Sequence, residues 1–376
     1  MAAGTAAQAS FAAATIGLPV LAPTLREEYD LSLREIGVLL AAVYVGTLAT
    51  LLLWGVAADR WGERVSLPLG LAGCSACLAA AAFAPSYGAL VAYLALAGAA
   101  GASVNSASGR AVVHWFPQDE RGLALGIRHT AIPIGGLVAA VALPALAAAG
   151  GSRYAFVFLA TLCAGGALTG ALVLRGRDTG DGIELESVTR TLRDRRLWRL
   201  SLGSGVYLYA QVAIIGFGVL LLHDEHDFSD RSAGLVIAAA LVLAGVLRIG
   251  IGHWSDVVRS RVLPLRIAGI AISVSVAVTA VLADGPVLLL VPALAVAGGL
   301  SMAWNGVALA AAAELARTGR SGASIGFQQS ALASISVVAP VVFATTVSAS
   351  TWSAALAVAA VVPLFGWLAL GELRDY

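Results

Sequence analysis

The chain has 376 residues, of which 59% are hydrophobic and only 12% are charged. A soluble globular chain carries about a quarter charged residues, so this composition excludes an ordinary soluble domain. The net charge of +1 gives no reason to expect a nucleic-acid partner. All 23 basic residues are Arg, which we attribute mainly to coding composition, so we use where they lie rather than how many there are.

The apolar residues form long stretches with few or no charges. In lipid, backbone amides must be bonded within their own segment, so a stretch of about 20 apolar residues has to be a helix. Breaks at charged, Gly and Pro clusters predict twelve transmembrane helices in chain order: 6–25, 35–57, 67–84, 89–113, 121–148, 153–174, 197–222, 231–254, 263–283, 286–313, 322–347 and 352–371. We therefore expect an all-α integral membrane protein.

The longest polar stretch follows six of these spans and precedes the other six. It predicts an N-terminal six-helix bundle over 1–174, a cytoplasmic linker over 175–196 and a C-terminal six-helix bundle over 197–376. The spacing of Leu185, Val188 and Leu192 in the linker allows a short amphipathic helix on the membrane face, and a solvated linker fits equally well.

The arginines are distributed unevenly between the two sides of the predicted membrane. With the N-terminus inside, sixteen Arg fall on the inner side and only four on the outer side: Arg26, Arg34, Arg153 and Arg231. An excess of basic residues marks the cytoplasmic side. We expect both termini to be cytoplasmic and the chain to lie in the cytoplasmic (plasma) membrane.

One loop pattern occurs twice, 197 residues apart. The loop after the second span reads Gly55-Val-Ala-Ala-Asp59-Arg60-Trp-Gly62-Glu-Arg64, and the loop after the eighth reads Gly252-His-Trp-Ser-Asp256-Val-Val-Arg259-Ser-Arg261. A unit of six helices thus recurs in the same orientation, and the predicted bundles are pseudo-symmetric.

The first copy resembles the G-x-x-x-D-R-x-G-x-R loop signature of the major facilitator superfamily, and the resemblance covers essentially the whole chain. It implies a secondary transporter in which Asp59 contacts the start of helix eleven across the interface between the halves. The resemblance therefore predicts a gate built from six motif residues: Gly55, Asp59, Arg60, Gly62, Arg64 and Asp256. The alternative reading is a basic loop that only sets the topology.

A second resemblance concerns the connector between the fourth and fifth spans, Trp115-Phe116-Pro117-Gln-Asp-Glu-Arg121-Gly-Leu-Ala-Leu-Gly126. It is similar to a W-F-P-x-x-x-R-x-x-A-x-G pattern in the cyanate-permease, oxalate/formate antiporter and monocarboxylate branches of that superfamily. The eighth span, which carries Arg248 and Asp256, resembles an R-x-x-x-G-x-x-S-D pattern of the same branches.

Three arginines, Arg110, Arg128 and Arg248, lie at membrane depth, away from the ends of the predicted spans, and no Asp or Glu lies deep in any span. A buried charge is costly and marks a functional position by default. A positive interior without carboxylates favours an anionic substrate, which would supply the missing partner charge. We expect Arg128 and Arg248 to bind it, whereas Arg110 lies near the inner end and more readily reaches the surface.

His129 is the one histidine at depth and is the candidate for carrying a coupling proton, although the neighbouring Arg128 opposes its protonation. Further polar candidates for the substrate site are Asn105, Tyr207, Gln211, Trp304, Asn305 and Gln328. Each is also a plausible helix-packing group.

Two departures from the patterns of these branches narrow the range of possible substrates. Position 51, opposite Arg248 in the repeat, is Leu rather than Arg, which disfavours nitrate, and the Lys positions of the monocarboxylate branch have no counterpart. The sequence therefore predicts a secondary active transporter of a small anion, with an efflux facilitator for neutral or amphipathic compounds as the alternative.

No nucleophile arrangement, metal-ligand cluster or phosphate loop is present in the sequence. We expect no enzyme activity, no cofactor and no bound metal. The expected partners are the anion, the lipid bilayer and a proton or counter-transported anion, and we expect a monomer.

Overall fold

The structure is a computed structural model that describes residues 2–104, 120–173, 193–315 and 321–373. Arg110, Asn105 and most of the predicted linker lie outside these ranges. Every regular element within them is a helix. In chain order these are α1 (Ala2–Gly17), η1 (Leu18–Leu21), α2 (Ala22–Tyr29), α3 (Leu33–Trp61), α4 (Glu63–Ala81), α5 (Tyr87–Gly101), α8 (Arg121–His129), α9 (Ala131–Val173), α11 (Arg195–Gly205), α12 (Tyr207–Gln211), the π-helical η2 (Val212–Gly216), α13 (Phe217–His226), α14 (Asp230–Val257), α15 (Val262–Leu282), α16 (Val287–Ala303), α17 (Asn305–Leu315), α18 (Ser321–Ala349) and α19 (Trp352–Gly371).

Ten helical stretches of the described chain are long and apolar enough to cross a membrane. One of them, Leu123–Val173, has 51 residues. Its backbone leaves helical geometry at Gly150 and at Gly151, where φ is 68°. The apolar helix α5 is shorter and ends at Gly101, just before a gap in the description. The predicted all-α membrane architecture is therefore confirmed, and α3, α14, α18 and α19 begin and end within a few residues of the spans predicted for them.

Four of the helices that start at one end of the molecule are capped by hydroxyl side chains. Ser32 accepts from the amide of Glu35 in a capping box, and Ser86, Ser229 and Thr351 accept similarly at the starts of α5, α14 and α19. These caps satisfy amides that have no intrahelical partner. We call this the hydroxyl-capped end. The basic end is the other one, with the turn at Gly62 and the loop 258–261.

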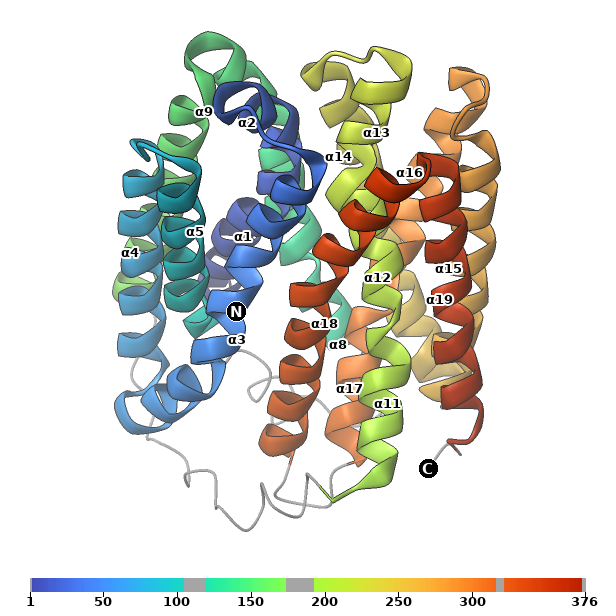
Figure 1. The fold of residues 1–376 in the computed structure, drawn as a ribbon. Coiled ribbons are helices and arrows are strands. Elements are labelled where there is room, and N and C mark those ends of the chain that lie inside the picture. Colours follow the sequence, from blue (N-terminus) through green and yellow to red (C-terminus); the bar gives the residue numbers. More distant parts are fainter. Residues whose placement is uncertain (1, 105–119, 174–192, 316–320, 374–376) are drawn as a thin grey trace.

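Figure 1 shows the helices in two groups. The early helices, α1 to α5 with α9, pack against one another, and so do the late helices, α11 to α19. Contact between the groups runs through α3 with α18 and through α14 with α8 and α9. The short helix α8 belongs to the early part of the sequence but also packs against α17.

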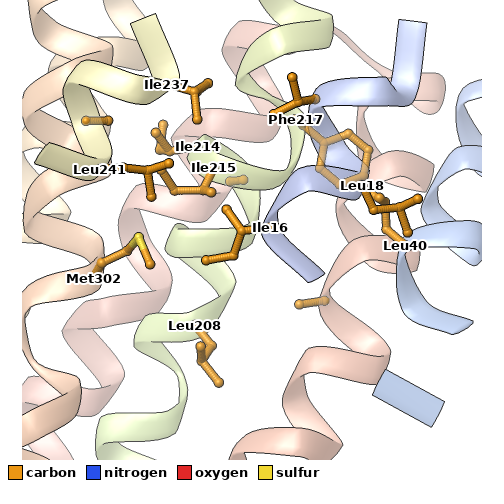
Figure 2. Packing of buried hydrophobic residues seen from close by; sticks show 14 of the residues in the cluster. Ile16, Leu18, Leu40, Leu208, Ile214, Ile215, Phe217, Ile237, Leu241 and Met302 are labelled. Carbon is orange, nitrogen blue, oxygen red and sulfur yellow. The ribbon is translucent and has the colours of Figure 1, made fainter. Parts of the chain in front are cut away.

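A buried apolar cluster joins the two groups in the middle of the molecule (Figure 2). Its labelled members come from α1, η1 and α3 on the early side and from α12, η2, α13, α14 and α16 on the late side: Ile16, Leu18, Leu40, Leu208, Ile214, Ile215, Phe217, Ile237, Leu241 and Met302. Each is less than 9% exposed. Burial of this many aliphatic groups holds early and late helices together in this conformation.

The interface between the early and late helices has two sides, one formed by α3 with α18 and the other by α8 with α14 and α17. The two sides differ in where their helices approach closely. Near the hydroxyl-capped end, a Cβ on Gly37 of α3 would lie 2.8 Å from the Pro340 carbonyl oxygen of α18. Towards the basic end of the same pair, Gly55 and Gly326 have no such neighbour within 4 Å. On the other side, Gly126 of α8 and Gly306 of α17 meet closely. The basic end is therefore tightly packed on the α8 side and loosely packed on the α3 side.

Candidate functional site

Arg248 of α14 is the most deeply buried charge in the described chain, with only 2% of the residue exposed. Its Nε donates to the carbonyl oxygen of Met302 at 2.7 Å, and its Nη1 donates to the carbonyl oxygen of His129 at 2.6 Å. The second bond crosses from the late to the early helices. Both acceptors are neutral, so neither neutralises the guanidinium.

The two carbonyls are available because both helices break there. Helix α8 ends at His129, and α9 begins again at Ala131. Helix α16 ends at Ala303, one residue after Met302. Carbonyls in the last turn of a helix lack intrahelical partners, so Arg248 satisfies one at each break.

No carboxylate of a described residue bonds to Arg248. An isolated buried charge costs several kcal/mol, by order of magnitude, unless an opposite charge or several hydrogen bonds compensate it. Two carbonyl bonds use only part of the five N–H donors that a guanidinium carries. The site thus has positive charge and donors to spare.

His129 of α8 lies beside this charge, and Arg128 precedes it in the last turn of the same helix. Within the described chain Arg128 makes no hydrogen bond or ion pair, although the charge of Glu63, at the start of α4, acts on it. The Nδ1 atom of His129 is buried and has no hydrogen-bond partner. We refer to Arg128, His129 and Arg248 as the arginine cluster.

Two of the polar residues predicted for the site have groups that could serve a ligand. The Nδ2 of Asn305 donates to the Met302 carbonyl at 3.3 Å, which places Asn305 on the same acceptor as Arg248. The Oε1 of Gln211 is buried without a partner at the end of α12. Only Asn305 is connected to the arginine cluster by a shared bond.

Two others of the predicted site residues hold late helices together. The hydroxyl of Tyr207 donates to the Leu265 carbonyl at 3.1 Å, and the ring stacks edge-to-face on Trp304. Gln328 is fully buried and bonds to the hydroxyls of Ser201 and Ser204 on α11. In this conformation both side chains are already engaged.

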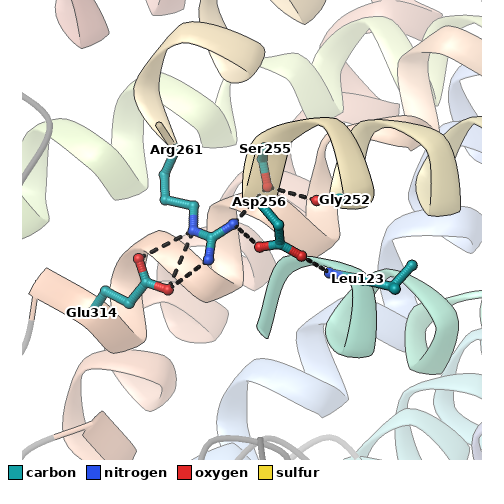
Figure 3. A network of polar contacts seen from close by, with 6 residues as sticks. All are labelled: Leu123, Gly252, Ser255, Asp256, Arg261 and Glu314. Atoms are coloured by element: carbon teal, nitrogen blue, oxygen red, sulfur yellow. Dashed lines mark hydrogen bonds and ion pairs between the residues drawn. The ribbon is translucent and has the colours of Figure 1, made fainter. Parts of the chain in front are cut away.

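A polar network lies at the basic end of α14 (Figure 3). Asp256 accepts from the backbone amide of Leu123 at 2.7 Å and from Nη1 of Arg261. Arg261 also donates to both carboxylate oxygens of Glu314, at 2.9 to 3.2 Å, and to Ser255 at 2.6 Å. Leu123 is in the first turn of α8, where free amides and the helix dipole favour an anion. Asp256 therefore ties the late helix α14 to the start of α8.

The first repeat of the loop motif is more exposed. Gly62 has a φ of 76° between α3 and α4, a conformation that suits glycine. Arg60 and Arg64 are exposed. The side chain of Asp59 lies outside the described part, so its predicted contact with helix eleven stays a prediction.

Sequence reasoning singled out Arg248 and Asp256 but missed their partners. These are backbone atoms: the carbonyls of His129 and Met302 and the amide of Leu123. Sequence reasoning also missed that Arg261 bonds Ser255, Asp256 and Glu314 together, which we call its hub role. Its recurrence 197 residues after Arg64 was visible in the sequence, but the pairing with Glu314 depends on how α15 and α17 pack.

Two grooves lie at the hydroxyl-capped end, away from the arginine cluster. One, of about 650 Å³, runs between α15 and α19 and includes Asp284 and Ser353. The other, of about 420 Å³, lies between α2, α9 and α14 and includes Glu27 and Arg231. Neither groove includes a residue predicted for the substrate site.

Comparison with known proteins places this geometry in a family. The profile of the Major Facilitator Superfamily matches residues 4–340. An uncharacterized MFS-type transporter of Mycobacterium tuberculosis is 31% identical over 93% of this chain and 79% of its own length. A probable sulfoacetate transporter of Cupriavidus necator is 26% identical over 67% of this chain and 63% of its own. A probable nitrate/nitrite antiporter of Thermus thermophilus is 29% identical over 65% and 58%.

Among solved structures, the human organic anion transporter MFSD10 (TETRAN) has the same fold. Its TM-score is 0.74, with 17% sequence identity, over 98% of this chain and 97% of that one. Ten helices long enough to cross a membrane, together with the family match, define a multi-pass membrane protein. The chain belongs to the Major Facilitator Superfamily, as the loop motif predicted, and its relatives are transporters rather than enzymes.

Proposed function

We propose that this chain is a secondary active transporter that moves a small organic anion across the cytoplasmic membrane by alternating access. The observation that carries the proposal is Arg248, a fully buried guanidinium that bonds only to carbonyls of the described chain. A charge in that position needs an opposite charge, and an anionic substrate supplies one.

The surroundings of Arg248 support an anion site. Arg128 adds a second positive charge on the same helix break, and the buried Nδ1 of His129 offers a donor in the tautomer that carries its proton there. Asn305 helps to position the Met302 carbonyl. We assign Arg128 and Arg248 as ligands, with Gln211 as a further candidate, and Tyr207 and Gln328 as packing residues in this conformation.

The names of similar proteins point the same way. Sulfoacetate and nitrate are small anions, and the structural neighbour is named as an organic anion transporter. Since Leu51 stands opposite Arg248 in the repeat, we favour an organic anion over nitrate. His129 stays the candidate for carrying a coupling proton should transport prove proton-driven.

For the architecture, we propose twelve crossings in two six-helix halves, 1–174 and 197–376. Two observations support twelve rather than ten: the break at Gly150 and Gly151 divides the 51-residue stretch, and α5 is apolar along its length. The excess of Arg at the basic end supports a cytoplasmic location for that end and for both termini.

The test is the thermal stability of purified protein in the presence of small anions, including sulfoacetate, formate, cyanate, a hexuronate and nitrate. A ligand that binds only the folded state raises the midpoint of unfolding. We expect one organic anion to stabilise the wild type, and Arg248→Gln and Arg128→Gln to weaken its binding by about tenfold or more. Arg199→Gln, which removes an exposed ion pair with Glu372, is the matched control.

If no anion stabilises the protein, while cells carrying it extrude amphipathic compounds and the two Gln variants still do so, the anion proposal is wrong. The efflux alternative then holds, and both arginines are structural.

A further inference from the structure

The groove between α15 and α19 at the hydroxyl-capped end lies outside the proposed substrate site. Its volume is about 650 Å³. The two helices lie side by side in the late group (Figure 1), where α15 also packs against α16, and α19 against α11 and α12. Two lining residues, Val281 and Val361, are 83% and 51% exposed. Exposed aliphatic side chains on a membrane-spanning helix face lipid, so the groove opens towards the bilayer.

The groove is about as long as one leaflet is thick. Along α15 and the turn after it, the groove runs from Ser273 to Asp284, and along α19 from Thr351 to Val361. At a rise of 1.5 Å per residue, these stretches are about 16 Å and about 15 Å long. The hydrocarbon core of a bilayer is about 30 Å thick, so one leaflet takes up about half of that. An acyl chain of this leaflet therefore fits along the whole groove.

The polar groups of the groove that remain available lie at one end. Asp284, Thr351 and Ser353 lie at the mouth, where α15 has ended and α19 begins. The hydroxyl at the far end, that of Ser273, already donates to the carbonyl oxygen of Ala360 at 2.6 Å. The walls between are small apolar side chains: Ala277, Ala280, Ala354, Ala357 and Ala360. A polar mouth at the membrane surface above an apolar bed matches the polarity of a phospholipid.

The mouth carries a carboxylate that can accept further hydrogen bonds. Asp284 accepts through Oδ2 from the hydroxyl of Ser353 at 2.6 Å. No described residue forms an ion pair with Asp284, and the described lining of the groove contains no Arg or His. An ionised carboxylate has about four lone-pair sites. Asp284 therefore has room for the N–H groups of a cationic ligand.

The mouth also carries a hydroxyl that can donate. The side-chain oxygen of Thr351 accepts from the amide of Ala354 as the N-cap of α19. This bond uses a lone pair and leaves the hydroxyl proton, which no described residue accepts. Thr351 is two residues from Ser353, the partner of Asp284. A carboxylate for an ammonium group and a hydroxyl for a phosphate oxygen thus lie together, as a zwitterionic headgroup requires.

We propose that this groove binds a phospholipid of the leaflet at the hydroxyl-capped end, with an acyl chain along the alanine walls and a primary ammonium headgroup on Asp284. Charge and hydrogen bonding select this headgroup. Asp284 repels a headgroup with net negative charge, and a quaternary ammonium has no N–H to donate to a carboxylate. The bound lipid joins the turn after α15 to the start of α19. The inference goes beyond the proposed transport function and does not depend on it.

The experiment varies one property of the headgroup at a time. The full chain is purified in detergent, and native mass spectrometry measures its affinity for phospholipids with identical acyl chains. The headgroups are ethanolamine, N-methylethanolamine, N,N-dimethylethanolamine, choline and glycerol. Asp284→Asn removes the charge at the mouth, and Asp227→Asn, at an exposed position of the same end, is its control. Ala357→Leu fills the groove, and Ala76→Leu, on the exposed face of α4, is its control.

We expect the wild type to bind the ethanolamine lipid about tenfold more tightly than the choline lipid, because hydrogen bonds to a charged group contribute about 1.5–3 kcal/mol. The affinity should fall with each added methyl group, since each one removes an N–H donor, and the glycerol lipid should bind weakly. Asp284→Asn should bind the ethanolamine lipid no better than the choline lipid. Ala357→Leu should weaken the binding of every lipid, and both controls should behave as the wild type.

Three results would overturn the proposal. One is equal affinity of the wild type for the ethanolamine and choline lipids, or a preference that Asp284→Asn keeps. Another is unchanged lipid binding by Ala357→Leu, which would place the lipid elsewhere. The third is a dimeric wild type that Ala357→Leu converts to a monomer, which would make a second copy of the chain the occupant. All are measured without a transported anion, so each leaves the proposed anion site untouched.

Discussion

Two arginines at equivalent positions of the internal repeat have opposite environments. Arg64 is exposed, whereas the side chain of Arg261 is 11% exposed and bonds Ser255, Asp256 and Glu314 together. Burial alone lowers the pKa of Arg261, but the hydrogen bonds and charges of Glu314, and then of Asp256, outweigh it and hold that pKa above the ordinary value for Arg.

A Lys at position 261 should therefore be damaging although it keeps the charge. A compact ammonium cannot reproduce a fork that reaches two carboxylates and a hydroxyl. We expect Arg261→Lys to cost about 1–3 kcal/mol, seen as a lower midpoint of thermal unfolding, and Arg64→Lys to change it by less than about 0.5 kcal/mol. Equal effects of the two variants would contradict the hub role of Arg261.

The pH dependence of that difference follows from the raised pKa of Arg261. A base whose pKa is raised by folding stabilises the protein fully below its unfolded pKa and stops doing so only as pH rises through its folded pKa. For Arg261 both values lie in strong alkali. The stability lost through Arg261→Lys should therefore be the same at pH 6 and pH 8, and a loss that grew over this range would show that another group titrates in the network.

At the scale of helices, Gly126 and Gly55 separate two kinds of glycine in the interface. Gly126 lies against the backbone of α14, and Gly55 has open space beside it. We expect Gly126→Ala to push α8 from α14, because a backbone carbonyl 2.8 Å away has little freedom to move. The unfolding midpoint should fall by an amount that corresponds to about 1–3 kcal/mol.

Gly55→Ala is the matched control for stability. In a helix interior, Ala is favoured over Gly by roughly 0.5–1 kcal/mol, so the variant should be as stable as the wild type or more stable. If the proposed alternating motion brings α18 against Gly55, the same variant should transport more slowly. A stable variant with undiminished transport would show that this close approach never occurs.

The sequence predicts the helices better than it predicts the contacts between them. Apolar length and hydroxyl or glycine signals place α19 on the predicted span 352–371, and the buried charge of Arg248 is evident without a structure. The partners of that charge were not predictable, since His129 and Met302 contribute carbonyls that packing exposes at helix breaks. Polarity in a span likewise does not distinguish a ligand from Tyr207, whose hydroxyl is used by Leu265.

For the whole molecule, both ends of the interface carry bonds between early and late helices. At the hydroxyl-capped end, Arg26 of α2 pairs with Asp224 of α13 at 2.7 Å, and Thr24 donates to Asp230 of α14 at 2.9 Å. Beneath them Val20 is 1% exposed. The alternating access proposed above requires these bonds to break whenever that end opens, so they bias the protein towards the conformation described above.

Arg26→Gln should shift this balance by a small and salt-dependent amount. The pair is partly exposed, at 38% and 22% of the two side chains, and such pairs contribute at most about 1 kcal/mol, or roughly a fivefold change in population. In a chain whose natural cysteines are replaced by Ser, we expect alkylation of Val20→Cys to be about two- to fivefold faster with Arg26→Gln than without it. The difference should shrink at 1 M salt because exposed charges are screened.

Exchanging the charges, Arg26→Asp with Asp224→Arg, should restore the slow rate, since the pair is re-formed with opposite polarity. If the single variant and the exchange alkylate equally fast, the effect comes from changed packing at position 26, and the ion pair does not hold this end closed.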